Sequence, residues 1–492
     1  MAGREPQNGS TDPKAARRRW QALAVGLVAA FMTLLDVSIV NVAVPSMEAA
    51  LRASPAELQW VLSGYALTFG LMLVPAGRFG DARGRRTVFV VGLALFTLTS
   101  AAAGLARSPT WLIIARLLQG AAAGVVNPQV VGLIQQLFHG PERGRPFGLL
   151  GATIGISTAI GPLLGGTLIH LEGTQEGWRW VFYVNVPVGI AAIFFAWRLI
   201  PAMPHGRPRR QSLDPIGVVL LGTGVVLLLL PLVQGQQWRS PLAWLLVPAG
   251  LVVLAGFLFW ERRYSRHREP LFDLALFRRR SYSLGSLIAL LYFAGFTAIF
   301  FIFTLYLQNG LGYSALLAGL AITPFALGSA ASSAIGGRIV DRFGRPLVAT
   351  GLAMVIAGLV ATVITLHFVP GRGAPLALAG PLLLAGLGSG LVITPNQALA
   401  LSEVPVAQGG SAAGMLQTGQ RIGSAAGIAG VGAVFFASLN ATGNGWSRAF
   451  RDALLVAIGF VLAAFVAALI DSRAGRKDNP PGGNLPSRAP TS

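Results

Sequence analysis

The sequence contains no cysteine and little charge. None of its 492 residues is Cys, and only 11% are Asp, Glu, Lys or Arg, whereas 53% are hydrophobic. The lack of Cys excludes disulfides, thiolate metal sites and cysteine nucleophiles. The shortage of charge leaves too little polar surface to cover a water-soluble globule of this length. We therefore predict a membrane protein.

Patterns typical of catalysis and of nucleotide binding are missing as well. The five His residues lie in linkers or near the ends of apolar runs, and none belongs to a His/Asp/Glu cluster at membrane depth. No GxxxxGK[ST] phosphate-binding loop occurs, so nothing in the sequence indicates a transport process that ATP hydrolysis drives. We expect no cofactor, no metal and no enzymatic activity.

Apolar windows recur from one end of the chain to the other. Each has about 20 residues, the length that an α-helix needs to cross roughly 30 Å of hydrocarbon. The alternating ten-residue pattern of a membrane barrel is not seen, so helices must satisfy the backbone hydrogen bonds. We predict fourteen spans, which begin near residues 21, 60, 87, 110, 147, 180, 214, 241, 283, 315, 347, 375, 408 and 450.

The basic residues favour one side of these spans. If the polar N-terminal stretch is cytosolic, most of the 38 Lys and Arg fall in the inner segments. This asymmetry obeys the positive-inside rule and predicts a multi-pass protein of the cell membrane with both termini in the cytosol. No small-residue cleavage site precedes the first apolar run, so we expect that span to be retained. The net charge of +20 then reflects the basic residues that orient the spans in the membrane, and we expect no nucleic-acid partner.

A ten-residue stretch occurs twice. GRFGDARGRR at 77–86 returns as GRIVDRFGRP at 337–346, and each copy joins two apolar runs on the predicted cytosolic side. Such an internal repeat indicates two similar halves. The predicted organisation is a tail at 1–20, a six-helix bundle at 21–200, basic linkers with two additional spans at 201–280, a second six-helix bundle at 281–471, and a disordered tail at 472–492. The two additional spans look like lipid-facing additions.

Five motifs, in order along the predicted spans, carry a family resemblance. They are LDVSIVNVAVP at 35–45, GRFGDARGRR at 77–86, ARLLQG at 115–120, GPLLGG at 161–166 and WRWVFYVNVPVG at 178–189. With them the chain resembles the major facilitator superfamily, and within it the fourteen-span drug/proton antiporter group. The resemblance implies an all-α integral membrane protein with the major facilitator fold, made of two six-helix bundles plus two inserted transmembrane helices. It also implies a proton-driven exporter.

Asp36 is the only acidic residue that we place well inside a span. A carboxylate in hydrocarbon costs at least ~3 kcal/mol, so it should face a cavity or a partner. Arg116 falls in the same half of the membrane, and we predict that it holds Asp36 ionised in one state and releases it for protonation in another. The alternatives are a purely structural Asp36 and an Arg116 that reaches the outer surface past Trp111.

Polar and aromatic residues within the spans define a predicted substrate cavity between the halves. Arg421 lies too deep to reach the surface, and it either contacts the substrate or belongs to a structural pair. The aromatic residues of the ninth span either form a core or partly line a cavity for bulky apolar or cationic compounds. Asn41 is more typical of a packing amide, and Glu403 is either a loop residue or an inner proton relay. The predicted set is Asn41, Tyr65, Gln129, Tyr292, Phe296, Asn396, Gln417, Gln420 and Arg421.

Both copies of the repeated stretch are predicted conformational latches. An acid beside a helix N-terminus and several Arg can hold two helices together and release them, although simple topological anchoring would also use the Arg. The residues are Gly77, Arg78, Asp81, Gly84, Arg85 and Arg86 in the first copy and Gly337, Asp341 and Arg345 in the second. The second copy lacks a counterpart of Arg86, so we expect it to be weaker.

The stretch GISTAIGPLLGG at 155–166 places small residues and a proline in the fifth span. Small residues let helices approach closely, and proline loosens a helix at a set point. We predict a hinge or seal between the halves, beyond ordinary close packing, at Gly155, Gly161, Pro162, Gly165 and Gly166. In the resembled superfamily this Gly-Pro motif marks exporters.

Together these features predict a proton-coupled exporter of hydrophobic or amphipathic small molecules such as drugs or antibiotics. It would work by alternating access, as a monomer, with the substrate, protons and the lipid bilayer as its partners. One alternative is a dedicated exporter of one endogenous metabolite or lipid-like compound. Another, from a different class, is a membrane receptor or enzyme that transports nothing.

Overall fold

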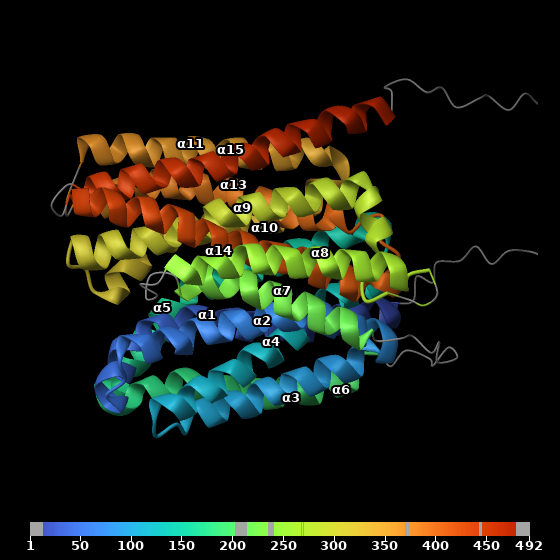
Figure 1. Cartoon of the computed structure of the whole chain (residues 1–492), viewed down its shortest axis with the longest axis horizontal. Helices are drawn as coiled ribbons and strands as arrows, with labels where there is room; N and C mark the ends of the chain where they lie inside the picture. The colour runs from blue at the N-terminus through green and yellow to red at the C-terminus, as the bar shows by residue number, and fades with distance from the viewer. Residues whose placement is uncertain are drawn as a thin grey trace, which may run out of the picture.

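A computed structural model describes residues 13–201, 214–234, 241–266, 268, 270–369, 371, 373–441 and 445–478. Every regular element in these ranges is helical, and the long helices run side by side (Figure 1). The helices before the predicted insertion are α1 (Pro13–Leu51), α2 (Pro55–Arg83), α3 (Arg85–Gly104), α4 (Pro109–Leu137), α5 (Gly144–Tyr183) and α6 (Asn185–Leu199). We call them the first half.

Two helices follow, α7 (Pro215–Gln234) and α8 (Leu246–Tyr264). The second half comprises α9 (Arg280–Leu305), α10 (Ala315–Phe343), α11 (Arg345–Phe368), the short α12 (Ala374–Ala377), α13 (Ala379–Ala400), α14 (Gly409–Ala441) and α15 (Trp446–Asp478). Within the described ranges, thirteen helices are long and apolar enough to cross a membrane, and Pro215–Pro231 is a shorter apolar helix. The chain is thus a multi-pass helical membrane protein.

The helix ends differ from the prediction mainly at the two termini. Helix α1 begins at Pro13, within the predicted tail, and α15 continues to Asp478, so residues 472–478 are helical. The rest of both predicted tails, and the predicted basic linker at 202–213, lie outside the described residues. Both ends of the described chain are at the same end of the bundle, on the right in Figure 1. The turns between α2 and α3 and between α10 and α11 lie there too, and we call this end the hairpin side.

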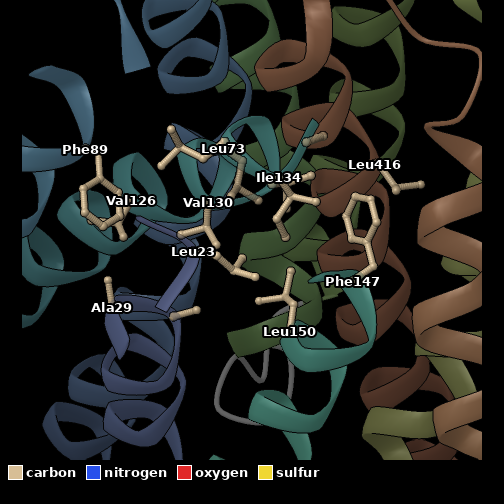
Figure 2. Close-up of a cluster of buried hydrophobic side chains, with 14 of the residues drawn as sticks. Leu23, Ala29, Leu73, Phe89, Val126, Val130, Ile134, Phe147, Leu150 and Leu416 are labelled. Atoms are coloured by element: carbon tan, nitrogen blue, oxygen red, sulfur yellow. The ribbon is translucent and has the colours of Figure 1, made fainter. Parts of the chain in front are cut away.

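A cluster of buried apolar side chains joins the helices of the first half. Figure 2 shows Leu23 of α1, Leu73 of α2, Phe89 of α3 and Val130 of α4 in this cluster. Leu416 of α14 belongs to the same cluster, so the core of the first half continues into the second. Because lipid tails are as apolar as these side chains, tight packing rather than exclusion from water stabilises such contacts.

The two halves meet where backbones approach closely, along α2 with α14 and along α5 with α10. A Cβ atom on Gly77 of α2 would overlap the carbonyl oxygen of Gly410 on α14. A Cβ atom on Gly337 of α10 would overlap the carbonyl oxygen of Gly144 on α5. The equivalent glycines of the two repeated stretches therefore each face the opposite half. We call these contacts the seam.

Gly84 and Gly344 end α2 and α10 at equivalent points of the repeat. Their φ angles are +97° and +57°, in the region that residues with a side chain rarely adopt. Each glycine lets the chain reverse at once into the next helix, which begins at the following residue. The repeat thus encodes two tight hairpins on the same side.

Helix α7 closes the seam from one side. Its Leu221, Val225 and Leu229 pack in one buried cluster with Val74 of α2 and Ala425 of α14. Helix α8 lies outside α7 (Figure 1) and presents exposed apolar residues, among them Leu251, Val252 and Phe259. The description of both inserted helices as lipid-facing additions is therefore wrong for α7 and holds for the outer face of α8.

Gly77→Val is expected to push α2 away from α14 and to lower the free energy of unfolding by about 1–3 kcal/mol, because overpacking forces backbones apart. The chain has no native cysteine, so spin labels can be placed directly through Arg83→Cys and Ala407→Cys. The distance between these labels should increase in Gly77→Val. Gly256→Ala is the control, since a Cβ atom there would meet nothing within 4 Å. An unchanged distance in Gly77→Val would contradict the tight seam.

Candidate functional site

Asp36 of α1 and Arg116 of α4 form an ion pair inside the first half. Nη1 of Arg116 lies 2.5 Å from Oδ2 of Asp36, and the two side chains are only 1% and 0% exposed. Both residues lie within candidate membrane spans. The two charges that the sequence places in one half of the membrane are thus in direct contact.

Two amide side chains complete the surroundings of the carboxylate. Oδ1 of Asp36 accepts hydrogen bonds from Nε2 of Gln119 at 2.9 Å and from Nδ2 of Asn185 at 3.1 Å. Oε1 of Gln119 in turn accepts a hydrogen bond from Nη1 of Arg116 at 2.9 Å. Amide groups carry both donors and acceptors, so they can bond to either protonation state of a carboxyl after a rotation. The site therefore offers partners to a charged and to a neutral Asp36.

Helix α2 holds the Arg116 side chain from the other side. Nε of Arg116 donates to the carbonyl oxygen of Val61 at 3.2 Å, and the guanidinium lies 4.2 Å from the centre of the Tyr65 ring. The Tyr65 hydroxyl donates to the carbonyl oxygen of Thr33 at 3.2 Å. The guanidinium is enclosed, so the alternative in which it reaches the outer surface past Trp111 does not apply to this structure.

An aromatic pair connects this site to the second half. The rings of Tyr65 and Phe69 on α2 stack with their centres 6.1 Å apart, and the guanidinium of Arg421 on α14 lies 4.4 Å from the centre of the Phe69 ring. The partners of Asp36 and Arg116 come from α1, α2, α4 and α6, so the ion pair is set back from the seam, whereas Arg421 lies at it. Within the described residues, Arg421 has no acidic partner and no hydrogen bond.

The other residues of the predicted cavity fall into three groups. Three amides donate to backbone carbonyls: Asn41 to Val37 of its own helix, Gln129 to Ala76 of α2, and Asn396 to Gly285 of α9. Tyr292 is buried and stacks on Phe296, with ring centres 5.5 Å apart, in the apolar cluster of the second half. Gln417 and Gln420 are partly exposed on α14 beside Arg421. Of the predicted set, Tyr65 packs against the ion pair and Arg421 lies across the seam from it.

The first hairpin ties the two halves together through Asp81. One carboxylate oxygen accepts from Nη2 of Arg85 at 2.7 Å and from the Gly410 amide at 3.0 Å, and the other accepts from the Ser411 amide at 2.9 Å and the Ser411 hydroxyl at 3.1 Å. Gly410 and Ser411 belong to the first turn of α14. Free amides and the helix dipole make a helix N-terminus a favourable place for a carboxylate. Arg85 adds a 2.5 Å hydrogen bond to the carbonyl oxygen of Val406.

The remaining hairpin residues are tied to other helices. The Arg86 guanidinium donates to the backbone carbonyl oxygen of Trp197 and lies 4.5 Å from the centre of the Trp197 ring. These two contacts join α3 to α6. Arg78 is 6% exposed. In the second hairpin, Arg345 pairs with Asp471 near the end of α15, and Asp341 is exposed without a hydrogen bond among the described residues. The second hairpin thus lacks the carboxylate cap that Asp81 gives α14.

The glycines of GISTAIGPLLGG face two different neighbours. Cβ atoms on Gly161 and Gly165 would press on Ser38 and Ile39 of α1, within the first half. A Cβ atom on Gly155 would press on Ala326 of α10 in the second half, one on Gly166 would stand in ordinary contact with Leu316, and Gly319 of α10 approaches Pro162. The only non-helical backbone within α5 is at Gly173, with φ +80°, and the helix runs through Pro162 without a break. This stretch therefore packs α5 on both halves at once.

Sequence reasoning missed Gln119 and Asn185. Gln119 lies three residues after Arg116, a spacing that puts both side chains on one helix face, so this signal was available. Asn185 starts α6 and is 149 residues from Asp36, so no local pattern points to their contact. Two further buried acids, Asp214 and Glu261, were also missed.

Arg116→Ala is expected to lower the free energy of unfolding by about 3–5 kcal/mol, because it leaves Asp36 as an unpaired buried charge. The double variant Asp36→Asn, Arg116→Gln should show a smaller loss in the free energy of unfolding, since it removes both charges. Chemical unfolding of the purified protein measures both. Glu142→Gln is the control, because Glu142 and Arg19 form an exposed pair at 3.3 Å and such pairs contribute at most about 1 kcal/mol. Equal losses in Arg116→Ala and in the control would contradict the paired, buried site.

Comparisons with known proteins identify the family. Residues 26–428 and 287–488 match the Major Facilitator Superfamily. The chain is 36% identical over 441 residues to the probable actinorhodin transporter of Streptomyces coelicolor, which covers 89% of this chain and 76% of that protein. It is 36% identical over 462 residues to the cephamycin export protein CmcT of Amycolatopsis lactamdurans, covering 90% and 91%.

A solved structure agrees in fold. The human organic anion transporter MFSD10 superposes with a TM-score of 0.66 at 15% sequence identity, covering 92% of this chain and 99% of that one. The similarity at this identity concerns the fold alone. The family match, the two relatives above 30% identity and the shared fold lead to one conclusion: the chain belongs to the Major Facilitator Superfamily.

Proposed function

We propose that this protein is a proton-coupled antiporter that exports hydrophobic or amphipathic small molecules, such as drugs or antibiotics, across the cell membrane. The observation that carries the proposal is the buried contact between Asp36 and Arg116 at membrane depth. A proton-coupled exporter needs a group that takes up and releases a proton during the cycle, and Asp36 is a carboxyl with partners for both forms.

Protonation would change the balance of charge around Arg116. With Asp36 ionised, the pair is neutral overall, and the two amides satisfy the second carboxylate oxygen. With Asp36 protonated, Arg116 keeps the Val61 carbonyl and the Tyr65 ring as partners but loses its counter-ion. An uncompensated charge in the membrane interior is costly. The protonated form would therefore favour a different arrangement of the helices around Arg116, which is the change that couples proton uptake to transport.

The hairpins would hold one face of the transporter closed. Asp81 binds the first turn of α14 through hydrogen bonds that can break and form again. We propose fourteen spans arranged as bundles at 21–200 and 281–471 with two inserted helices, both termini and the hairpin side in the cytosol, and a monomer as the working unit. The GISTAIGPLLGG stretch, which packs on both halves, would be the hinge or seal between them.

The names of the relatives support an export role for drug-like compounds. They include the cephamycin export protein, a puromycin resistance protein of Streptomyces alboniger and the multidrug resistance protein Stp of Mycobacterium tuberculosis. The second candidate is an exporter of one endogenous product, which the name of the actinorhodin transporter favours. A compound panel separates the two, because a dedicated exporter accepts one member and a drug exporter accepts several.

Inside-out vesicles with an acidic lumen are expected to accumulate substrate when the protein is native and to stay at the level of empty vesicles with Asp36→Asn, which cannot take up a proton. Arg116→Lys should reduce uptake, because lysine keeps the charge but not the fork of donors. Glu48→Gln removes an exposed carboxyl from the same helix and serves as the control. Uptake that is independent of the pH gradient and unchanged in Asp36→Asn would exclude proton antiport.

Arg421 is proposed to contact the substrate from the second half. Arg421→Gln should then raise KM for transport with little change in kcat, because it removes a contact made equally in the ground state and in the transition state. Arg421→Lys, which keeps the charge, should restore part of the affinity. A structural role predicts a different result: Arg421→Gln would lower the unfolding midpoint and leave KM unchanged.

A further inference from the structure

A second pair of buried acids lies on the inserted helices, away from Asp36. Asp214 immediately precedes α7, and Glu261 belongs to the last turn of α8 on the hairpin side. Both are 0% exposed. A Cβ atom on Gly217 would overlap Oδ2 of Asp214 and would stand 3.1 Å from Oε1 of Glu261. The two carboxyl groups therefore face the same small space, which the absence of a side chain at Gly217 keeps open.

The two acids are partnered unequally. Asp214 accepts hydrogen bonds from Nε1 of Trp260 at 3.0 Å and from the Gly217 amide at 3.1 Å. Both carboxyl oxygens of Glu261 are buried, and within the described residues their approaches to the backbone amides of Leu271 and Phe272 do not reach normal hydrogen-bond geometry. A buried carboxylate that is poorly hydrogen-bonded and lies beside a second carboxylate is unfavourable through desolvation and through repulsion. A proton held between the two groups removes both problems, because it cancels one charge and provides a donor.

Within the part of the chain that the structure describes, two charged groups act on Glu261. Asp214 acts on it from the segment before α7 and Arg78 acts on it from α2, while the amides of Leu271 and Phe272 lie nearby. Helix α14 contributes the apolar residues Ile422 and Ala425 to the cluster at this point. Among the described residues, Arg78 is the cation that acts on Glu261, and it lies three residues before Asp81 on α2.

We propose that Asp214 and Glu261 share one proton and form a second proton-binding site, carried by the inserted helices, that acts on the seam through Arg78. Loss of the shared proton gives the pair a second negative charge beside Arg78. The stronger attraction holds α2 more firmly against α7, at the end where Asp81 binds the first turn of α14. The inserted helices would thus adjust the closed hairpin side to the pH on that side. Proton binding does not depend on transport, whereas this effect on the cycle rests on the proposed antiporter function.

Infrared titration of the purified full-length protein tests the binding step. The native protein should show a protonated-carboxyl C=O band that disappears as the pH rises, and that shifts in frequency when glutamate is labelled with ¹³C. Glu261→Gln and Asp214→Asn should each abolish the titrating band, and the exposed control Glu48→Gln should retain it. Absence of the band from the native protein would overturn the proposal, whatever the folding of the variants. So would a spectrum that follows the sodium or potassium concentration instead of the pH.

Vesicle transport tests the effect on the cycle and separates this proposal from the function of Asp36. Glu261→Gln mimics a fixed proton, so it should keep substrate accumulation but remove or shift its dependence on the pH of the hairpin side. Asp36→Asn should abolish accumulation and leave the infrared band of the acid pair in place. A Glu261→Gln variant with an unaltered pH profile would overturn the regulatory role. If Asp36→Asn transports normally while the band is present, the antiporter proposal fails and the proton site stands.

Discussion

The cost of placing charge inside a membrane determines how the first half is built. Asp36 and Arg116 are tolerable at their depth only because each lies against the other and because neighbouring groups satisfy the remaining donors and acceptors. Those groups come from three helices: Val61 and Tyr65 from α2, Gln119 from α4 itself and Asn185 from α6, around Asp36 on α1. A shift of any one of these helices would leave a buried polar atom without a partner. The ion pair therefore holds the first half together as a unit.

The seam between the halves is of a different kind. Besides the apolar cluster that Leu416 joins, it has backbone contacts at glycines and a carboxylate on a helix N-terminus, with Gly77 against Gly410 and Asp81 against Ser411. In a bilayer no hydrophobic force drives helices together, so such contacts rest on close fit and on hydrogen bonds. A few hydrogen bonds to a charged group, each contributing about 1.5–3 kcal/mol, can form and break in a cycle. Such contacts are of the kind that the proposed alternating-access cycle would break and form again.

Sequence reasoning could predict the features that depend on length, depth and repetition. Apolar run lengths gave helices that begin close to the predicted residues, and the depths of Asp36 and Arg116 along two antiparallel spans predicted their contact. It could not predict Asn185 as a partner, because a contact between distant segments leaves no local pattern. It also missed Glu261, because the arginines that follow it read as a basic linker, while the fold turns the carboxyl inward. Burial of a single side chain depends on which helix covers it, and here the packing of α7 on α2 and of α8 on α7 determines that.

Helix α2 is the element on which these sites converge. The Tyr65 ring contacts the guanidinium of Arg116, and the Phe69 ring contacts that of Arg421. Val74 packs with α7, and Asp81 binds α14. Arg78 lies between Val74 and Asp81, beside the acid pair of the inserted helices. Pro75 lies within α2 between Val74 and Arg78, so the contacts of Tyr65 and Phe69 and those of Arg78 and Asp81 belong to two segments of the helix that a proline separates. Protonation of Asp36 would therefore act on the seam through the segment before Pro75, and protonation of the acid pair would act through the segment after it, which carries Asp81.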